Sequence, residues 1–136
     1  MQPTEAHQFF TLDDVRKIAA VTTDTAREAR AQAGACLLFL SGMRADALAS
    51  LPISCVDLAN GLIFQSPARG VRTKNRKSAT TYLLDLPDLF RVVQAWDSRV
   101  RSAFSPAALW YATLTTDGMA VTETLRAHLN RRTVVG

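Results

Sequence analysis

The sequence has few of the residues that build metal sites, disulfide frameworks or membrane spans. It contains two cysteines and two histidines, and neither Cys36 nor Cys55 has a histidine or a second cysteine at a metal-ligand spacing. Its one long apolar stretch, residues 33–40, is far too short to cross a bilayer. The first ten residues lack the basic region and apolar run of a secretory signal. We therefore expect no metal and no membrane span, and a cytoplasmic chain with both thiols reduced and buried.

Internal repeats, low-complexity tracts and linkers are also absent. Hydrophobic residues make up 48% of the 136 residues and charged residues 21%, a balance that is typical of globular proteins and excludes intrinsic disorder. A chain of this length can bury roughly two-thirds of the surface that its unfolded form exposes. We therefore predict a single domain over residues 1–136.

Positive charge is concentrated in one segment. The net charge of +4 is a mild excess, but five cations occur in a short stretch that contains no acidic residue: Arg69, Arg72, Lys74, Arg76 and Lys77. Such a cluster is either a solvated loop or a surface that binds phosphates, and charge alone does not separate the two.

The first third of the chain has the periodicity of helices. Thr11, followed by two carboxylates, predicts an N-cap and a helix that begins at Leu12. Residues 22–24 interrupt this helix and can cap the next. An apolar stripe at helical spacing then predicts a second helix over residues 25–40. A short third helix over residues 44–50 ends before Pro52.

The period changes to that of strands after Pro52. Residues 56–58 and 62–65 flank Asn60-Gly61, which predicts a β-hairpin, and residues 80–84 predict a third strand. A helix follows Pro87, residues 110–114 form a short strand or an aromatic-packed loop, and residues 122–130 are predicted to be helical. The fold class is α+β, mostly α-helical with a small three-stranded antiparallel sheet. Four aromatic residues are expected to pack: Tyr82, Trp96, Trp110 and Tyr111.

Two local patterns within this order resemble the tyrosine recombinases of the phage-integrase family. Residues 41–51, SGMRADALASL, followed by Val56-Asp57-Leu58, resemble the family's first arginine box, T-G-L-R-x-x-E-L-x-x-L, and the strand that follows it. Residues 71–78, VRTKNRKS, followed by YLLDLP, are similar to a family hairpin that carries a catalytic lysine. The resemblance covers residues 9–96 in good register and the rest more loosely. It implies an integrase catalytic-domain-like fold.

The resemblance also implies roles for individual residues. Arg44 matches the first catalytic arginine, whose planar guanidinium binds two phosphate oxygens and would be held rigidly between two helices. Lys74 matches the general acid that protonates the departing 5′ oxygen, and Lys77 is the alternative because the loop can be aligned differently. Arg72, Arg76 and Lys77 are expected to bind neighbouring DNA phosphates.

The sequence departs from the family pattern at several positions. The acidic residue expected three places after Arg44 is Ala47, with Asp46 one place early, and Cys55 stands where an aspartate often lies. Residues 128–131 spell His-x-x-Arg, but they lie within a predicted helix and no tyrosine follows them, so we do not take them as the family's box. The catalytic set of this chain is therefore incomplete.

The resemblance as a whole implies the front part of a recombinase catalytic domain. The parent enzyme would break and rejoin double-stranded DNA through a 3′-phosphotyrosyl intermediate, without a metal or nucleotide cofactor, and would self-associate on DNA. Two other functions stay open. One is a non-catalytic DNA-binding or regulatory module derived from an integrase, and the other is a protein-interaction domain whose basic loop is solvated surface.

Overall fold

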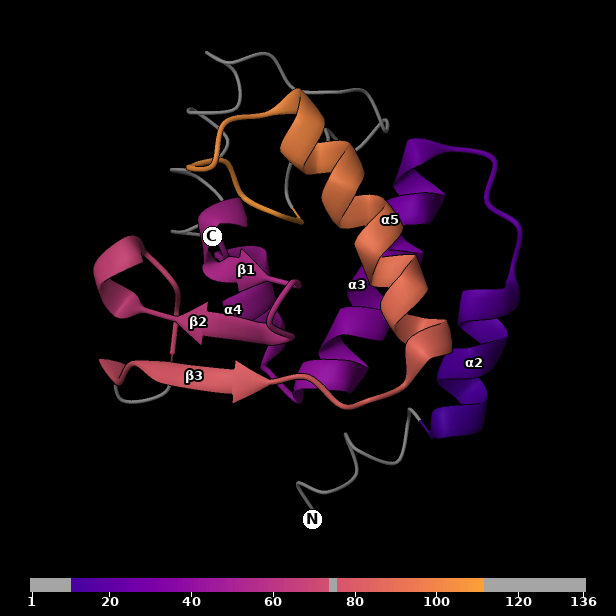
Figure 1. The fold of residues 1–136 in the computed structure, drawn as a ribbon, viewed down its shortest axis with the longest axis horizontal. Helices are drawn as coiled ribbons and strands as arrows, with labels where there is room; N and C mark the ends of the chain where they lie inside the picture. Colours follow the sequence, from indigo (N-terminus) through magenta and orange to yellow (C-terminus); the bar gives the residue numbers. More distant parts are fainter. Residues whose placement is uncertain (1–10, 74–75, 112–136) are drawn as a thin grey trace.

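The computed structural model describes residues 11–73 and 76–111 (Figure 1). Its fold is mixed α+β with a small three-stranded antiparallel sheet, which confirms the predicted class. None of the helices in this part of the chain is long and apolar enough to cross a membrane. The elements in chain order are α2 (Leu12–Ala20), α3 (Ala26–Ser41), α4 (Ala45–Ala49), the 3-10 turn η1 (Ile53–Cys55), β1 (Val56–Asp57), β2 (Leu62–Gln65), the 3-10 turn η2 (Pro67–Arg69), β3 (Ala79–Tyr82) and α5 (Pro87–Ala103).

The first two helices begin with the same reciprocal cap. Thr11 Oγ1 accepts the Asp14 amide at 3.1 Å, and the Asp14 carboxylate accepts the Thr11 amide at 3.2 Å. Thr25 and Glu28 repeat this arrangement at the start of α3, so Thr25, rather than the preceding residues 22–24, is the cap. Two backbone amides donate to the Glu28 carboxylate and hold its pKa below the usual range. Each box satisfies amides that would otherwise lack a partner in the first turn.

The core lies mainly between α3 and α5. The apolar stripe predicted on α3 is buried from Ala33 to Leu40, and the predicted face of α5 is buried as well. Helix α2 packs against both through Val15, which is fully buried. The buried α5 side chains are Leu89, Val93, Trp96 and Val100.

The sheet lies beside these helices and contributes one face to the core (Figure 1). Its strand order is β1-β2-β3, with Val56 opposite Ile63 and Ile63 opposite Thr81. The predicted hairpin is therefore confirmed, with Gly61 in the left-handed conformation at its turn. Ile63 is fully buried and Val56 nearly so, which fixes the face that the sheet presents to the helices.

After α5 the chain returns past η1. Amides of Ile53 and Trp110 donate to the carbonyls of Ala108 and Leu51, both at 2.8 Å, around an isolated bridge between Pro52 and Leu109. Up to Tyr111 this return is a loop that contains the buried Trp110, and the prediction over residues 110–114 stays open because only its first two residues are described. Residues 112–114 lie outside the described residues. The helix predicted over residues 122–130 and the His-x-x-Arg sequence at residues 128–131 lie outside them as well.

A buried carboxylate joins this returning loop to α5. Asp97 accepts from Trp110 Nε1 at 2.9 Å and from Arg101 Nη2 at 2.9 Å. Arg101 Nη2 also donates to the Val56 carbonyl at 2.8 Å, so one guanidinium connects α5 to β1. The hydrogen bond with Asp97 raises the pKa of Arg101.

Candidate nucleic-acid interface

Arg44 occupies the sharp turn between α3 and α4. Gly42 ends α3 with φ +69°, and its amide donates to the Leu38 carbonyl at 2.8 Å. Ser41 Oγ donates to the Leu37 carbonyl at 2.7 Å and accepts the Met43 amide at 3.1 Å. Only glycine adopts this left-handed conformation at little cost, so the turn fixes the backbone of Arg44 at the N-cap of α4.

The side chain of Arg44 is exposed. Its Nη2 lies 3.9 Å from Asp46 Oδ2, and the exposed fractions of the two side chains are 61% and 60%. We expected the guanidinium of this arginine to be held rigidly between two helices. The turn fixes the backbone of Arg44, whereas its side chain is exposed to solvent. Ala47, at the position where the family carries an acid, is buried against the core. Asp46 instead supplies the carboxylate beside Arg44, and because the pair is solvated it stabilises the fold little.

An apolar groove begins beside Arg44. Its volume is about 1050 Å³, and α3, α4 and Tyr111 form its walls. The side chains that line it include Leu38, Phe39, Met43 and Leu48. Gly34 lies within it so close to Tyr111 that an added Cβ would come 2.5 Å from the ring.

The loop that joins β2 to β3, residues 66–78, is anchored to the rest of the domain at two points. Val71 is 3% exposed and belongs to the core. The Arg72 amide donates to Ser50 Oγ at 2.9 Å, and Ser50 Oγ in turn donates to the Asp46 carbonyl at 2.9 Å. Ser50 is itself buried at the C-terminal end of α4. The loop is therefore bound to the short helix that Arg44 begins.

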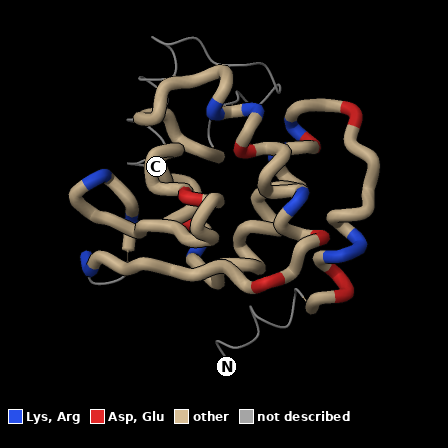
Figure 2. The backbone as a smooth tube through the Cα atoms, viewed as in Figure 1, with Lys and Arg blue, Asp and Glu red and all other residues tan. Residues whose placement is uncertain are grey.

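The described cations of this loop are mostly exposed, although Arg69 Nη1 donates to Sγ of the buried Cys55 at 3.9 Å. Arg69, Arg76 and Lys77 are exposed, and Arg72 is half-buried. Arg76 adopts φ +56°, a conformation uncommon for residues other than glycine. Figure 2 shows positive segments in the loop and no negative one. Lys74, the predicted general acid, lies outside the described residues.

A small hollow opens within the loop. Its volume is about 330 Å³, and Gly70, Arg72, Thr73 and Arg76 are among the residues that line it. Thr73 Oγ1 is buried there and has no hydrogen-bond partner among the described residues. A buried hydroxyl without a hydrogen-bond partner destabilises the folded loop.

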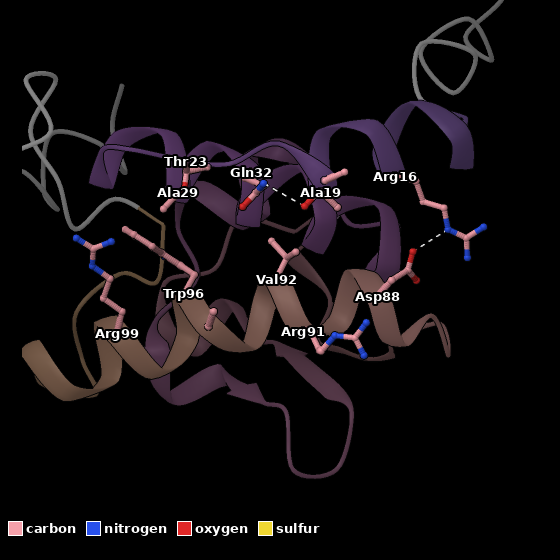
Figure 3. A pocket seen from close by; sticks show the side chains of 12 residues that line it. Arg16, Ala19, Thr23, Ala29, Gln32, Asp88, Arg91, Val92, Trp96 and Arg99 are labelled. Atoms are coloured by element: carbon pink, nitrogen blue, oxygen red, sulfur yellow. Dashed lines mark hydrogen bonds and ion pairs between the residues drawn. The ribbon is translucent and has the colours of Figure 1, made fainter.

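A second and larger hollow lies on the opposite side of the domain, between α2, α3 and α5 (Figure 3). Arg16 Nε and Asp88 Oδ2 meet across it at 2.8 Å. This contact raises the pKa of Arg16 and lowers that of Asp88. Gln32 Nε2 donates to the carbonyls of Ile18, Ala19 and Val21 and so holds the end of α2. The hollow of about 610 Å³ is a helix junction, far in sequence from the predicted site.

The two cysteines match their predicted state. Both are buried and free, and burial raises the pKa of the Cys36 thiol to about 11. Within residues 11–73 and 76–111, no three His, Cys, Asp or Glu side chains are close enough to hold a metal ion.

The prediction that four aromatic residues pack is confirmed for some of them and wrong for Tyr82. Trp96 and Trp110 are buried as expected, and Trp96 Nε1 donates to the Trp110 carbonyl at 3.0 Å. Tyr111 packs beside Gly34, with Arg30 lying 4.7 Å from its ring centroid. Tyr82 was predicted to pack, and this is wrong: it is 71% exposed. Its strand register turns it away from the core, because the neighbouring Thr81 lies opposite the buried Ile63.

The residue predictions omitted two side chains that anchor the basic loop. Ser50 was counted only as the end of a helix, and Val71 only as part of a motif. Ser50 had no sequence signal, because its partner Arg72 is 22 positions away. No protein-family model matches the chain, and no curated protein matches it either.

Proposed function

We propose that this chain is the front part of an integrase-like catalytic domain and binds the phosphate backbone of double-stranded DNA. The observation that carries the proposal is the hydrogen bond between the Arg72 amide and Ser50 Oγ. It couples the basic loop to α4, the helix whose N-cap is Arg44. The two sequence patterns that resemble the recombinase family are thereby held on one rigid unit.

The dimensions of α4 suit a phosphate backbone. Ser50 is six positions after Arg44, which corresponds to about 9 Å along a helix at ~1.5 Å per residue. One DNA strand advances ~3.4 Å per nucleotide, so Arg44 at one end of α4 and the basic loop that Ser50 anchors at the other end are spaced to contact phosphates about three nucleotides apart. Arg44 and the loop can therefore contact one strand together.

The proposal gives each cation a role. Arg44 binds the non-bridging oxygens of the phosphate that is attacked, where its guanidinium stabilises developing negative charge. Lys74 is the general acid for the departing 5′ oxygen, with Lys77 as the alternative. Arg72, Arg76 and Lys77 bind neighbouring phosphates.

In this proposal the chain supplies the phosphate contacts and the general acid, and the nucleophilic tyrosine lies elsewhere in the recombinase. Neither Tyr82 nor Tyr111 follows a His-x-x-Arg box. Strand cleavage is therefore proposed for the complete enzyme, which would assemble as several copies on DNA and require no metal.

DNA binding is tested by fluorescence anisotropy with a labelled 20-base-pair duplex at increasing salt. Contacts with four or five phosphates predict a slope of log K against log salt near −4, since each contributes about −0.9. Arg76→Ala should make the slope less steep by about 1. Arg27→Ala, which removes an exposed arginine from α3 and changes the net charge equally, should leave it unchanged.

The catalytic roles need a separate test in the complete recombinase. Arg44→Ala and Lys74→Ala should each reduce cleavage of a suicide substrate by at least 100-fold, in the range known for lost transition-state contacts. Near-wild-type cleavage by both variants would contradict the assignment. If the chain binds the duplex but neither substitution affects cleavage, the non-catalytic DNA-binding module is favoured. If the chain has no affinity for DNA, the protein-interaction domain is favoured.

A further inference from the structure

The face of the sheet that points away from the helices carries two exposed aromatic rings. Directly paired residues share a face, so the pairs Leu62–Tyr82 and Phe64–Thr80 lie together on this outer face. Phe64 is 40% exposed and Tyr82 is 71% exposed. The inner face carries Ile63, which is fully buried, so this difference between the faces follows from the register.

The two rings occupy a diagonal position on neighbouring strands. Diagonal partners lie ~7–8 Å apart, within reach of each other for large side chains. Exposed aromatic residues are otherwise unfavourable on a sheet surface because they keep apolar area in water. Two of them on the same face form a flat apolar surface with π character, which can bind a flat partner.

Positive charge lies at one end of this outer face. The loop of residues 66–78 leaves β2 at Gln65 and returns to β3 at Ala79, so the residues at its two ends, with Arg69 and Lys77 among them, lie toward the Phe64–Thr80 pair. A hollow of about 350 Å³ contains both kinds of group, since Phe64, Arg69 and Thr80 line it together. The surface therefore offers rings and guanidinium groups to the same ligand.

We infer that the outer face of this sheet binds single-stranded nucleic acid, with bases stacked on Phe64 and Tyr82 and phosphates contacted by Arg69, Arg76 and Lys77. Every base has a π face, so stacking on rings tolerates any sequence, and the cations follow the backbone. Paired bases within a duplex do not expose these faces. The excess of cations, without any acidic residue in the loop, favours this polyanion over an apolar protein partner.

This inference goes beyond the proposed recombinase function and shares with it only the cations of the loop, because Arg44 has no part in single-strand binding and the two rings have none in duplex binding. Duplex binding would rest on the phosphate contacts of Arg44 and the loop. Single-strand binding would rest on the two rings together with the loop. Substitutions of the rings and of Arg44 therefore separate the two activities.

The test measures anisotropy of labelled dT12, rU12 and a 12-base-pair duplex with the full chain and its variants. Phe64→Ala and Tyr82→Ala should each weaken dT12 binding between about 5-fold and 100-fold, the range measured for lost base stacking. Tyr82→Phe keeps the ring and should bind as the native chain does. Val21→Ala, which removes an exposed apolar side chain from the end of α2, is the matched control.

Comparing the affinities for rU12 and dT12 shows whether the bound strand is RNA or unpaired DNA. Tighter binding of rU12 than dT12 assigns the face to RNA, and the reverse assigns it to DNA that has been unpaired. Binding of the duplex should change less than 2-fold in the ring variants, whereas Arg44→Ala should weaken the duplex and leave dT12 unchanged.

Photo-cross-linking gives a readout that does not depend on the stability of a variant. A dT12 probe with 5-iodouracil should cross-link to peptides that contain Phe64 or Tyr82. Cross-links elsewhere, or dT12 binding that the double Phe64→Ala/Tyr82→Ala variant retains in full, would overturn the inference. Concentration-dependent dimers that the same double variant abolishes would also overturn it, because a second copy would then be the occupant.

Discussion

Aromatic side chains are buried in the helical layer and exposed on the outer face of the sheet. Trp96 and Trp110 are buried between α5 and the returning loop, where both indole N–H groups have hydrogen-bond acceptors. Phe64 and Tyr82, on the sheet, have their rings turned to solvent. In the first region aromatic area stabilises the fold, and in the second it is free to bind a partner.

The loop of residues 66–78 and α4 form a third region, in which buried and exposed side chains occur together. Val71 and Ser50 are buried, yet Arg76 and Lys77 in the same loop as Val71 are exposed. The buried residues therefore fix the position of the exposed ones. Stability and binding should respond separately to substitutions in the three regions, and the following predictions test that separation.

The largest effect on stability is expected at Trp110. Trp110→Ala removes a fully buried ring and leaves Asp97 without the indole donor, so it should lower the free energy of unfolding by about 3–5 kcal/mol. Urea denaturation followed by circular dichroism measures this loss. Phe64→Ala removes another aromatic ring and should cost less than half as much. Equal losses would remove the distinction between the two regions.

The second effect is a pH dependence that originates in the helical layer. Burial raises the pKa of Cys36 to about 11 from an ordinary value of 9.0, so the folded chain holds this proton more tightly than the unfolded chain. The contribution of this thiol to the free energy of unfolding is fully present below pH 9. It is lost as pH rises from 9 to 11, which lowers the free energy of unfolding by up to roughly 2–3 kcal/mol.

Denaturation midpoints of the native chain and of Cys36→Ala, measured at pH 8 and pH 10.5, isolate this contribution from other groups. The native chain should lose more stability over this interval than the variant. The same pH dependence in both proteins would show that the thiol does not contribute.

A smaller loss of stability is expected at Ser50. Ser50→Ala leaves the Arg72 amide without its acceptor, which should cost about 1 kcal/mol. Duplex affinity should fall as well, because the loop is no longer fixed relative to Arg44. Ser102→Ala, which removes an exposed serine hydroxyl from α5, should alter neither quantity. Reduced stability with unchanged duplex affinity would mean that the link is only structural.

The smallest effect on stability is expected at Tyr82. Because its side chain is mostly solvated, Tyr82→Ala should change the free energy of unfolding by less than about 0.5 kcal/mol. The same change should weaken dT12 binding markedly. A large loss of stability without a loss of binding would place Tyr82 with the buried aromatic residues.

Local signals in the sequence predicted most of the elements. Thr11 with its first-turn carboxylates, Asn60-Gly61 and Pro87 each specify a cap, a turn or a helix start within a few residues. The apolar stripes of α3 and α5 predicted the core because helical spacing alone determines which side chains share a face. The cap of α3 was placed slightly early because three polar residues precede Thr25.

The orientation of Tyr82 could not be predicted in the same way. Residues 80–84 alternate weakly, since two threonines are followed by Tyr82 and two leucines, so either face could have been the buried one. The pairing of Ile63 with Thr81 determines the face, and that pairing depends on the core. The Ser50–Arg72 contact was equally inaccessible, because a serine has no periodic pattern that reveals a distant partner.

The guanidinium of Arg101 has a consequence for the order in which the chain folds. It bonds the carbonyls of Val56 and Ile53, which precede it by 45 and 48 positions. Closing so long a loop costs entropy before any contact compensates for it, whereas the capped helices and the hairpin form from neighbouring residues. We therefore expect the arrival of α5 on β1 and η1 to limit the folding rate, with local helices and the hairpin forming earlier.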